Sequence, residues 1–251
     1  VGMTGLNEKL LMKRGIAYEK VYVHPASHAG YYPGAHPLSL KLLFDPEKGT
    51  ILGAQAVGAD GVDKRIDVIA TAMRSGQTVF DLEHLELCYA PPFGSAKDPV
   101  NYAGFVASNL LRGDCAQAYV EQILESSGDR VLLDVRTAAE VEGGKIPEAL
   151  HVPIDELRER REEVPKDKEV VAYCKVGLRG YLACRILTQH GYRCRNLAGG
   201  YTTYRAVTEP LPRGSRPTAE IRSDTGLDSP ESAVAHGELA REIDACGMQC
   251  P

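Results

Sequence analysis

The chain has 251 residues, of which 43% are hydrophobic and 25% charged, and its formal net charge is -5. This composition is typical of a soluble protein with room for two domains, and the acidic balance argues against nucleic acid as a partner. No apolar run approaches the roughly 18 residues of a membrane span, and the first residues lack the apolar core of a signal peptide. Seven scattered cysteines favour a reducing cytoplasm over a secreted disulfide framework.

Residues 1–113 are predicted to form an α+β domain. The predicted strands cover residues 20–24, 38–45 and 50–58. The last two flank the turn sequence PEKG and are predicted to pair as an antiparallel hairpin. A helix is predicted over 61–76, where apolar residues recur at helical spacing, and another over 98–114, with Asp98 as cap and Pro99 as first helical residue. A block of strands with helices around it indicates the α+β class.

Residues 114–208 alternate between predicted helices and predicted strands. The strands are predicted at 130–136, 169–174 and 193–197. The helices are predicted at 117–126, 137–142, 154–162, 179–190 and 200–206. Alternation of this kind implies an α/β domain with a central parallel sheet and helices on its faces.

The end of the chain has no sustained apolar period. Residues 209–240 are rich in Pro, Ser and Gly and are predicted to be a flexible linker. Residues 241–251, REIDACGMQCP, read as the opening of a third unit. Because the chain begins at Val1 and stops inside this unit, we expect it to be a piece of a longer protein.

Cys174 stands where a predicted strand ends, in front of a loop with two glycines and two cations. A parallel strand delivers such a side chain to the carboxyl edge of the sheet, where open α/β sheets place their sites. The backbone N–H groups of residues 175–179, at the start of a helix, can surround the sulfur and stabilise an anion. Gly177 and Gly180 allow the sharp turn. The pattern predicts a nucleophilic thiolate that can also hold a second anionic sulfur.

Two alternatives remain for Cys174. A free cysteine at a strand end is commonly a small buried hydrophobe. Cysteine phosphatases use a similar loop, but the four residues between Cys174 and Arg179 make this loop shorter than theirs and leave less room for a phosphoryl group. By contrast, Cys184 lies among apolar residues inside the predicted helix and is predicted to belong to the core. Cys88, beside an aromatic residue and two prolines, is also predicted to be buried.

Residues 114–208 resemble a rhodanese domain. The segments that carry the resemblance are LLDVRTAAEVEGGKIPEALHVP (132–153), CKVGLRG (174–180) and LAGGYTTYR (197–205). The resemblance implies that Cys174 accepts a sulfane sulfur and carries it as a persulfide. The residues whose amides would hold that sulfur are Lys175, Val176, Gly177, Leu178 and Arg179.

The rhodanese resemblance also implies roles and departures outside the cysteine loop. Asp134 and Arg136 would brace the loop from the neighbouring strand. Lys145 stands where the family usually has histidine, and Glu148 where it usually has glycine. These departures leave the choice of sulfur donor open.

Three tyrosines of the first domain, Tyr31, Tyr32 and Tyr89, lie in sequences rich in glycine and proline. From spacing alone, packing and ligand contact both explain them. The segments GMTGLNEK, HAGYYPGA, KLLFD, ILGAQAVG, GVDKRIDVIA and YAPPFGSAKDPVN resemble the C-terminal dimerisation domain of coenzyme A-disulfide reductases. Those are FAD- and NAD(P)H-dependent pyridine nucleotide-disulfide oxidoreductases. The resemblance implies a homodimer in which Tyr31 or Tyr32, and Tyr89, contact the substrate in the partner subunit's active site.

The tail sequence DACGMQCP resembles the start of a TusA-like sulfur-carrier domain, which implies that Cys250 is a second carrier thiol. A tail artefact or a loose metal pair with Cys246 is the alternative. No dinucleotide fingerprint is present, because GADG at 58–61 lacks the remaining glycines. We therefore expect no cofactor and no metal on this chain alone, and FAD, NAD(P)H and coenzyme A in the longer protein.

The expected function is sulfur transfer through Cys174, with small sulfur donors and thiol acceptors as partners. The alternative is a non-catalytic dimerisation and docking module, which an intact cysteine loop disfavours.

Overall fold

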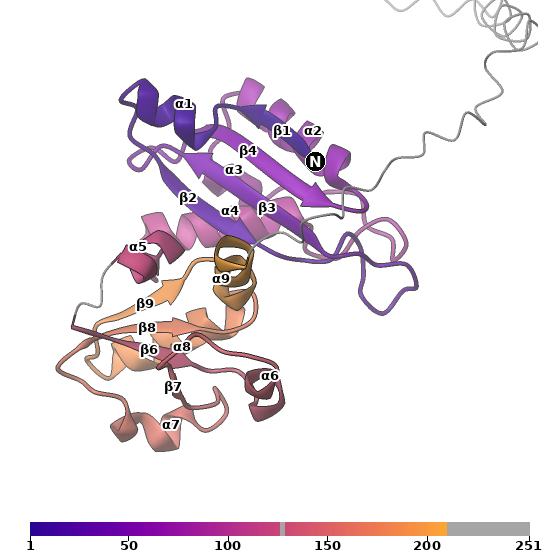
Figure 1. Ribbon diagram of the computed structural model, residues 1–251. Coiled ribbons are helices and arrows are strands. Elements are labelled where there is room, and N and C mark those ends of the chain that lie inside the picture. Colours follow the sequence, from indigo (N-terminus) through magenta and orange to yellow (C-terminus); the bar gives the residue numbers. More distant parts are fainter. Residues whose placement is uncertain (126–128, 210–251) are drawn as a thin grey trace, which may run out of the picture. The chain divides into compact units, whose positions relative to one another are not determined.

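The computed structural model describes residues 1–125 and 129–209 (Figure 1). Within these residues, no helix has the length and apolar character needed to cross a membrane. The predicted TusA-like unit at 241–251, with Cys250, and all but the first residue of the predicted linker lie outside the described residues.

A four-stranded antiparallel sheet with the order β1-β4-β3-β2 forms the centre of the N-terminal region (Figure 1). Its strands are β1 (Gly2–Gly5), β2 (Glu19–Val23), β3 (Leu38–Phe44) and β4 (Ile51–Gly58). Leu40 pairs with Ala56 across β3 and β4, which confirms the predicted hairpin. The short strand β1 was not predicted, since four residues show too little alternation to mark a strand.

Four helices accompany this sheet. They are α1 (Glu8–Lys13), α2 (Val62–Arg74), α3 (Val79–Glu83) and α4 (Pro99–Leu111). Asp98 caps α4 by accepting from the Val100 amide, and Pro99 is its first residue, as predicted. The apolar sides of α2, α3 and α4 pack with β2, β3 and β4 in one core that includes Phe44, Ile69 and Leu82. The helices α1 and α3 are too short to show a clear helical period and were missed.

The second sheet has five parallel strands in the order β5-β9-β8-β6-β7. They are β5 (Gln117–Ala118), β6 (Arg130–Asp134), β7 (Leu150–His151), β8 (Glu169–Tyr173) and β9 (Cys194–Leu197). The prediction of a helix from residue 117 was wrong at its start, because Gln117 pairs with Asn196 as part of β5. Two-residue strands such as β5 and β7 have no period of their own, and only pairing with a distant strand creates them.

Helices cover both faces of the parallel sheet. They are α5 (Val120–Glu125), α6 (Ala138–Glu142), α7 (Leu157–Arg160) with a 3₁₀ turn (Arg161–Glu163), α8 (Leu178–Gln189) and α9 (Gly200–Thr208). Alternate residues of β8 enter two cores, as the period of a strand requires. Ala172 packs with residues of α7 and α8, whereas Tyr173 packs with β9 and residues of α9.

Candidate functional site

Cys174 follows the last residue of β8, at the carboxyl edge of the parallel sheet, as predicted. Its side chain is buried, with 1% of the residue exposed. The Gly177 amide donates to the sulfur at 3.1 Å. Lys175, Val176 and Leu178 are exposed, so the loop that surrounds the buried thiol borders solvent.

Glycine is required at two places where the chain passes from the loop into α8. Gly177 has a φ of 115°, a conformation that other residues avoid, and precedes the first helical residue. Gly180 faces the Asn196 side chain so closely that a Cβ would lie 2.3 Å from Asn196 Oδ1. These contacts explain why the loop can turn tightly enough to bring an amide onto the sulfur.

The start of α9 holds the first two carbonyls of the cysteine loop. The Tyr201 amide donates to Cys174 O at 2.8 Å, and the Thr202 amide donates to Lys175 O at 2.9 Å. Gly200 makes this approach possible, since a Cβ there would lie 2.4 Å from Cys174 O. The second glycine of the sequence AGGY, Gly200, therefore serves the backbone contact between α9 and the loop.

A buried asparagine that sequence reasoning missed holds a third carbonyl. Asn196, on β9, donates from Nδ2 to Gly177 O at 3.1 Å. A trans peptide points its N–H away from its carbonyl. Because the carbonyls of residues 174, 175 and 177 are held from outside, the amides of residues 175, 176 and 178 point to the other side of the backbone. An inward row of N–H groups of this kind favours an anion.

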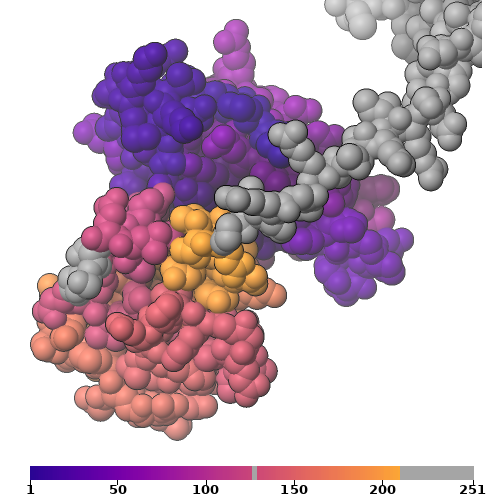
Figure 2. All heavy atoms as spheres, viewed as in Figure 1, coloured from indigo at the N-terminus to yellow at the C-terminus, as the bar shows by residue number. Residues whose placement is uncertain are grey.

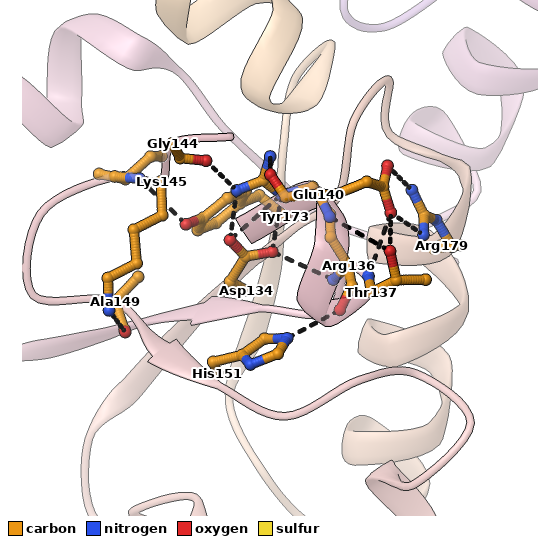
Figure 3. Close-up of polar contacts among 11 residues, drawn as sticks. Asp134, Arg136, Thr137, Glu140, Gly144, Lys145, Ala149, His151, Tyr173 and Arg179 are labelled. Atoms are coloured by element: carbon orange, nitrogen blue, oxygen red, sulfur yellow. Dashed lines mark hydrogen bonds and ion pairs between the residues drawn. The ribbon is translucent and has the colours of Figure 1, made fainter. Parts of the chain in front are cut away.

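Arg179 forms an ion pair with Glu140 of α6, another residue that sequence reasoning missed. Nη1 and Nη2 of Arg179 each donate to one carboxylate oxygen of Glu140 at 2.7 Å (Figure 3). The hydrogen bonds from Arg179 lower the pKa of Glu140 to about 2. Glu140 also accepts from the Thr137 amide at the start of α6. The charge of Arg179 is thus shared with a carboxylate, and the pair joins α6 to the cysteine loop.

Asp134 and Arg136 form a buried ion pair next to β8. Arg136 donates to Asp134 Oδ2 at 2.6 Å and to Gly144 O at 2.8 Å (Figure 3). Its guanidinium also lies 4.2 Å from the centre of the Tyr201 ring. Through Gly144 O and the Tyr201 ring, the Arg136 side chain contacts the segment that follows α6 and the start of α9. The ion pair is also linked to the cysteine strand, because the Arg136 guanidinium lies 5.6 Å from the centre of the Tyr173 ring and the Val135 amide donates to Tyr173 O at 3.0 Å.

The two departures from the family pattern lie in the turn before β7. Lys145 donates to Ala149 O at 3.4 Å (Figure 3). Glu148 has a φ of 60° and is the one residue other than glycine, within the described ranges, in the left-handed region. This backbone geometry explains why glycine suits position 148.

The predicted tyrosines of the first domain gather at two loops that meet. Tyr31 Oη and Tyr89 Oη lie 2.9 Å apart in a hydrogen bond, although 58 residues separate them. Tyr31 is 76% exposed and Tyr89 is 51% exposed. Tyr32 lies edge-on to the His28 ring. The loop between β2 and β3, which carries Tyr31 and Tyr32, is at the surface in Figure 2.

A buried ion pair holds the bases of both tyrosine loops. Arg65, on α2, donates to Asp98 Oδ2 at 2.8 Å and to Ser27 O at 2.6 Å. Ser27 lies in the loop between β2 and β3, ahead of Tyr31, and Asp98 is the last residue of the loop between α3 and α4 that carries Tyr89. The Ala29 amide donates to Gly94 O at 3.0 Å and joins the loops directly.

Both Cys184 and Cys88 were predicted to be buried, and the structure confirms this for one of them. Cys184 is buried in the core of the second domain, as predicted. Cys88 is exposed, so the prediction that it is buried was wrong. It lies in the loop between α3 and α4 that carries Tyr89. Its apolar neighbours in the sequence belong to this surface loop and not to a helix or strand.

The comparisons with known proteins identify two domain families. Residues 1–99 match the model of the pyridine nucleotide-disulphide oxidoreductase dimerisation domain. Residues 116–206 match the model of the rhodanese-like domain. These matches confirm the predicted fold class of an α+β dimerisation domain followed by an α/β rhodanese domain.

Similar proteins include a coenzyme A disulfide reductase and a persulfide reductase. The chain is 46% identical over 90 residues to coenzyme A disulfide reductase of Staphylococcus epidermidis, covering 36% of this chain and 20% of that protein. The structure of reduced Bacillus anthracis CoADR-RHD is 49% identical and has a TM-score of 0.78, covering 82% of this chain and 37% of that one. A NAD-dependent persulfide reductase from A. fulgidus is 40% identical with a TM-score of 0.72, covering 79% and 36%.

The chain therefore spans about a fifth of the curated relatives it matches and little more than a third of these two structures. Its first segment is a pyridine nucleotide-disulphide oxidoreductase dimerisation domain, and its second is a rhodanese-like domain.

Proposed function

We propose that this chain transfers sulfane sulfur through a persulfide on Cys174, as part of a larger coenzyme A-disulfide or persulfide reductase. The observation that carries the proposal is the buried Cys174 sulfur, which accepts from the Gly177 amide at 3.1 Å inside a loop whose carbonyls are bound from outside. Such a loop stabilises a negative charge on one sulfur and has further amides for a second.

In the loading step, the Cys174 thiolate attacks the outer sulfur of a donor such as thiosulfate. A sulfur–sulfur bond forms on Cys174, the donor's own bond to that sulfur breaks, and sulfite leaves with the electron pair. The terminal sulfur of the persulfide then carries the charge. The amides of residues 175–179 hold it, and Asn196 and the start of α9 keep those amides in place.

In the unloading step, a thiolate or cyanide attacks the terminal sulfur. The new bond forms to the acceptor, the persulfide bond breaks, and the Cys174 thiolate is restored. No net oxidation occurs over the cycle, so the transfer itself requires no flavin or nicotinamide.

The tyrosine loops support the proposal that this chain is part of a larger coenzyme A-disulfide or persulfide reductase. In a homodimer, Tyr31 or Tyr32, and Tyr89, would contact a coenzyme A disulfide or persulfide bound by the partner subunit. FAD and NAD(P)H would be bound by other parts of the longer protein. Light scattering at twice the monomer mass would support the dimer, and a clean monomer would count against it.

The test compares Cys174→Ser with Cys184→Ser in thiosulfate-to-cyanide transfer. We expect Cys174→Ser to abolish transfer and Cys184→Ser, whose thiol lies in the core, to retain it. Intact-mass measurement after thiosulfate treatment should show one added sulfur atom that cyanide removes. Retained transfer in Cys174→Ser would overturn the proposal.

A further inference from the structure

Three cysteines that the proposed function does not use lie close together where α8 packs against β9. Cys115 precedes β5, Cys184 lies in the middle of α8, and Cys194 is the first residue of β9. The Cys194 thiol donates to Cys184 Sγ at 3.0 Å. Cys184 is also in hydrogen-bonding contact with Cys115. All three are free thiols.

The surroundings give the three thiols different access and different chemistry. Cys184 is 1% exposed and Cys115 is 7% exposed, whereas Cys194 is half-buried. Hydrogen bonds with Cys115 and Cys194, together with burial, raise the pKa of Cys184. Because Cys194 is more exposed than Cys184, a reagent from solvent reaches Cys194 first. The raised pKa of Cys184 keeps its thiol protonated.

The sulfur–sulfur distance places this pair close to bonding. A disulfide has a sulfur separation of about 2.05 Å, so the 3.0 Å contact between Cys184 and Cys194 needs a closure of about 1 Å. The pair joins a helix to the strand packed beside it. The Cys174 sulfur, by contrast, accepts from the Gly177 amide at the other end of β8.

We propose that Cys184 and Cys194 are a redox-active dithiol that hydrogen peroxide converts into a disulfide within the rhodanese-like domain. Peroxide is the appropriate oxidant because it is small enough to reach a half-buried thiol above a buried one. The bond ties α8 to β9 and leaves Cys174 free.

The reaction has two steps. The Cys194 thiol gives up its proton as its sulfur attacks one peroxide oxygen, the oxygen–oxygen bond breaks, and the hydroxide that leaves takes up this proton to form water. This gives a sulfenic acid on Cys194. Cys184 then loses its proton and attacks the sulfenic sulfur, the sulfur–oxygen bond breaks, and a second water leaves. The two sulfurs are oxidised, and both peroxide oxygens are reduced to water.

The experiment uses the full chain, treated with hydrogen peroxide, alkylated with N-ethylmaleimide in denaturant and digested with trypsin. Cleavage at the arginines places Cys184 in the peptide GYLACR and Cys194 in the dipeptide CR, and Cys115 falls in the longer peptide 113–130. We expect mass spectrometry to find GYLACR linked to CR, and dithiothreitol to abolish this species.

Two variants control the assignment. Cys194→Ser should lose the link and leave Cys184 open to alkylation, and Cys115→Ser should keep the link. Melting curves of both variants show whether either substitution unfolds the chain. The wild-type peptide map tests the link directly, even if a variant does not fold. A link from GYLACR to peptide 113–130 in place of CR would overturn the proposal. So would full alkylation of Cys184 at a peroxide dose that oxidises Cys174.

Discussion

The cysteine loop and the paired tyrosine loops carry the two proposed roles of this chain, and they are held in different ways. The cysteine loop is fixed by backbone hydrogen bonds from α9, by Asn196 and by the turn into α8, and it encloses a buried sulfur. The tyrosine loops present exposed hydroxyls, and their bases are held by the buried ion pair of Arg65 with Asp98 and by the Ala29 amide, which donates to Gly94 O. In the proposed function, the first region forms a complete site within one domain. The second would offer its hydroxyl groups to a substrate bound by the partner subunit.

This difference predicts different responses to mutation. A site fixed by many backbone contacts loses activity when the backbone is displaced, whereas its domain keeps most of its stability. Loops whose bases contain a buried ion pair lose stability when one partner of the pair is removed, because a buried charge is left unpaired.

The largest expected effect is on the tyrosine side. Arg65→Ala leaves Asp98 buried without its partner and should lower the free energy of unfolding by about 3–5 kcal/mol. Arg74→Ala, at the exposed end of the same helix, should change it by less than about 0.5 kcal/mol. Urea denaturation of both variants measures the contrast. Equal stabilities would show that the ion pair does not hold these loops.

The next effect concerns the approach of α9 to the cysteine loop. Gly200→Ala places a Cβ 2.4 Å from Cys174 O and should lower thiosulfate-to-cyanide transfer about tenfold to a hundredfold through displacement of the loop. Gly15→Ala is the matched control, because Gly15 has a similar φ of 64° and no heavy atom within 4 Å of its Cβ position. The control should lose some stability and no transfer activity. Similar activity losses in both variants would contradict this role of Gly200.

A smaller effect is expected at Asn196. Asn196→Ala removes one hydrogen bond to Gly177 O, worth about 1 kcal/mol, and should lower sulfur transfer about fivefold. Gly180→Ala should be destabilising in the wild-type chain, where its Cβ meets Asn196 Oδ1, and tolerated in the Asn196→Ala chain. Unfolding measurements on the two single variants and the double variant give the coupling. Additive changes would mean that the two residues do not constrain each other.

The smallest effect concerns the ion pair between Arg179 and Glu140. Its pairing lowers the pKa of Glu140 to about 2, below the ordinary value near 4.3. The stabilisation is therefore complete above about pH 4.3 and is lost as the pH falls toward 2. Because both side chains are partly exposed, we expect less than about 1 kcal/mol. Unfolding curves of wild type and Glu140→Gln should converge over this acid range, and a constant difference would contradict the assignment.

Much of the cysteine site could be predicted because its signals are local. A strand that ends at Cys174, a glycine with positive φ and a helix start follow one another along the chain, and the structure has them in that order. The cap at Asp98 and the hairpin between β3 and β4 were predicted for the same reason. Turn chemistry and periodicity depend on residues a few positions apart.

The remaining contacts depend on segments that only the folded chain brings together. Glu140 reaches Arg179 across 39 residues, Tyr31 meets Tyr89, and the two-residue strand β5 exists only because β9 lies beside it. Cys88 and Cys184 have similar apolar neighbours in sequence, yet one is exposed and the other buried. The sequence by itself determined the main strands and helices and the place of Cys174 in a loop between a strand and a helix. Tertiary packing decided which distant side chains hold that loop, because burial and pairing are properties of three-dimensional neighbours.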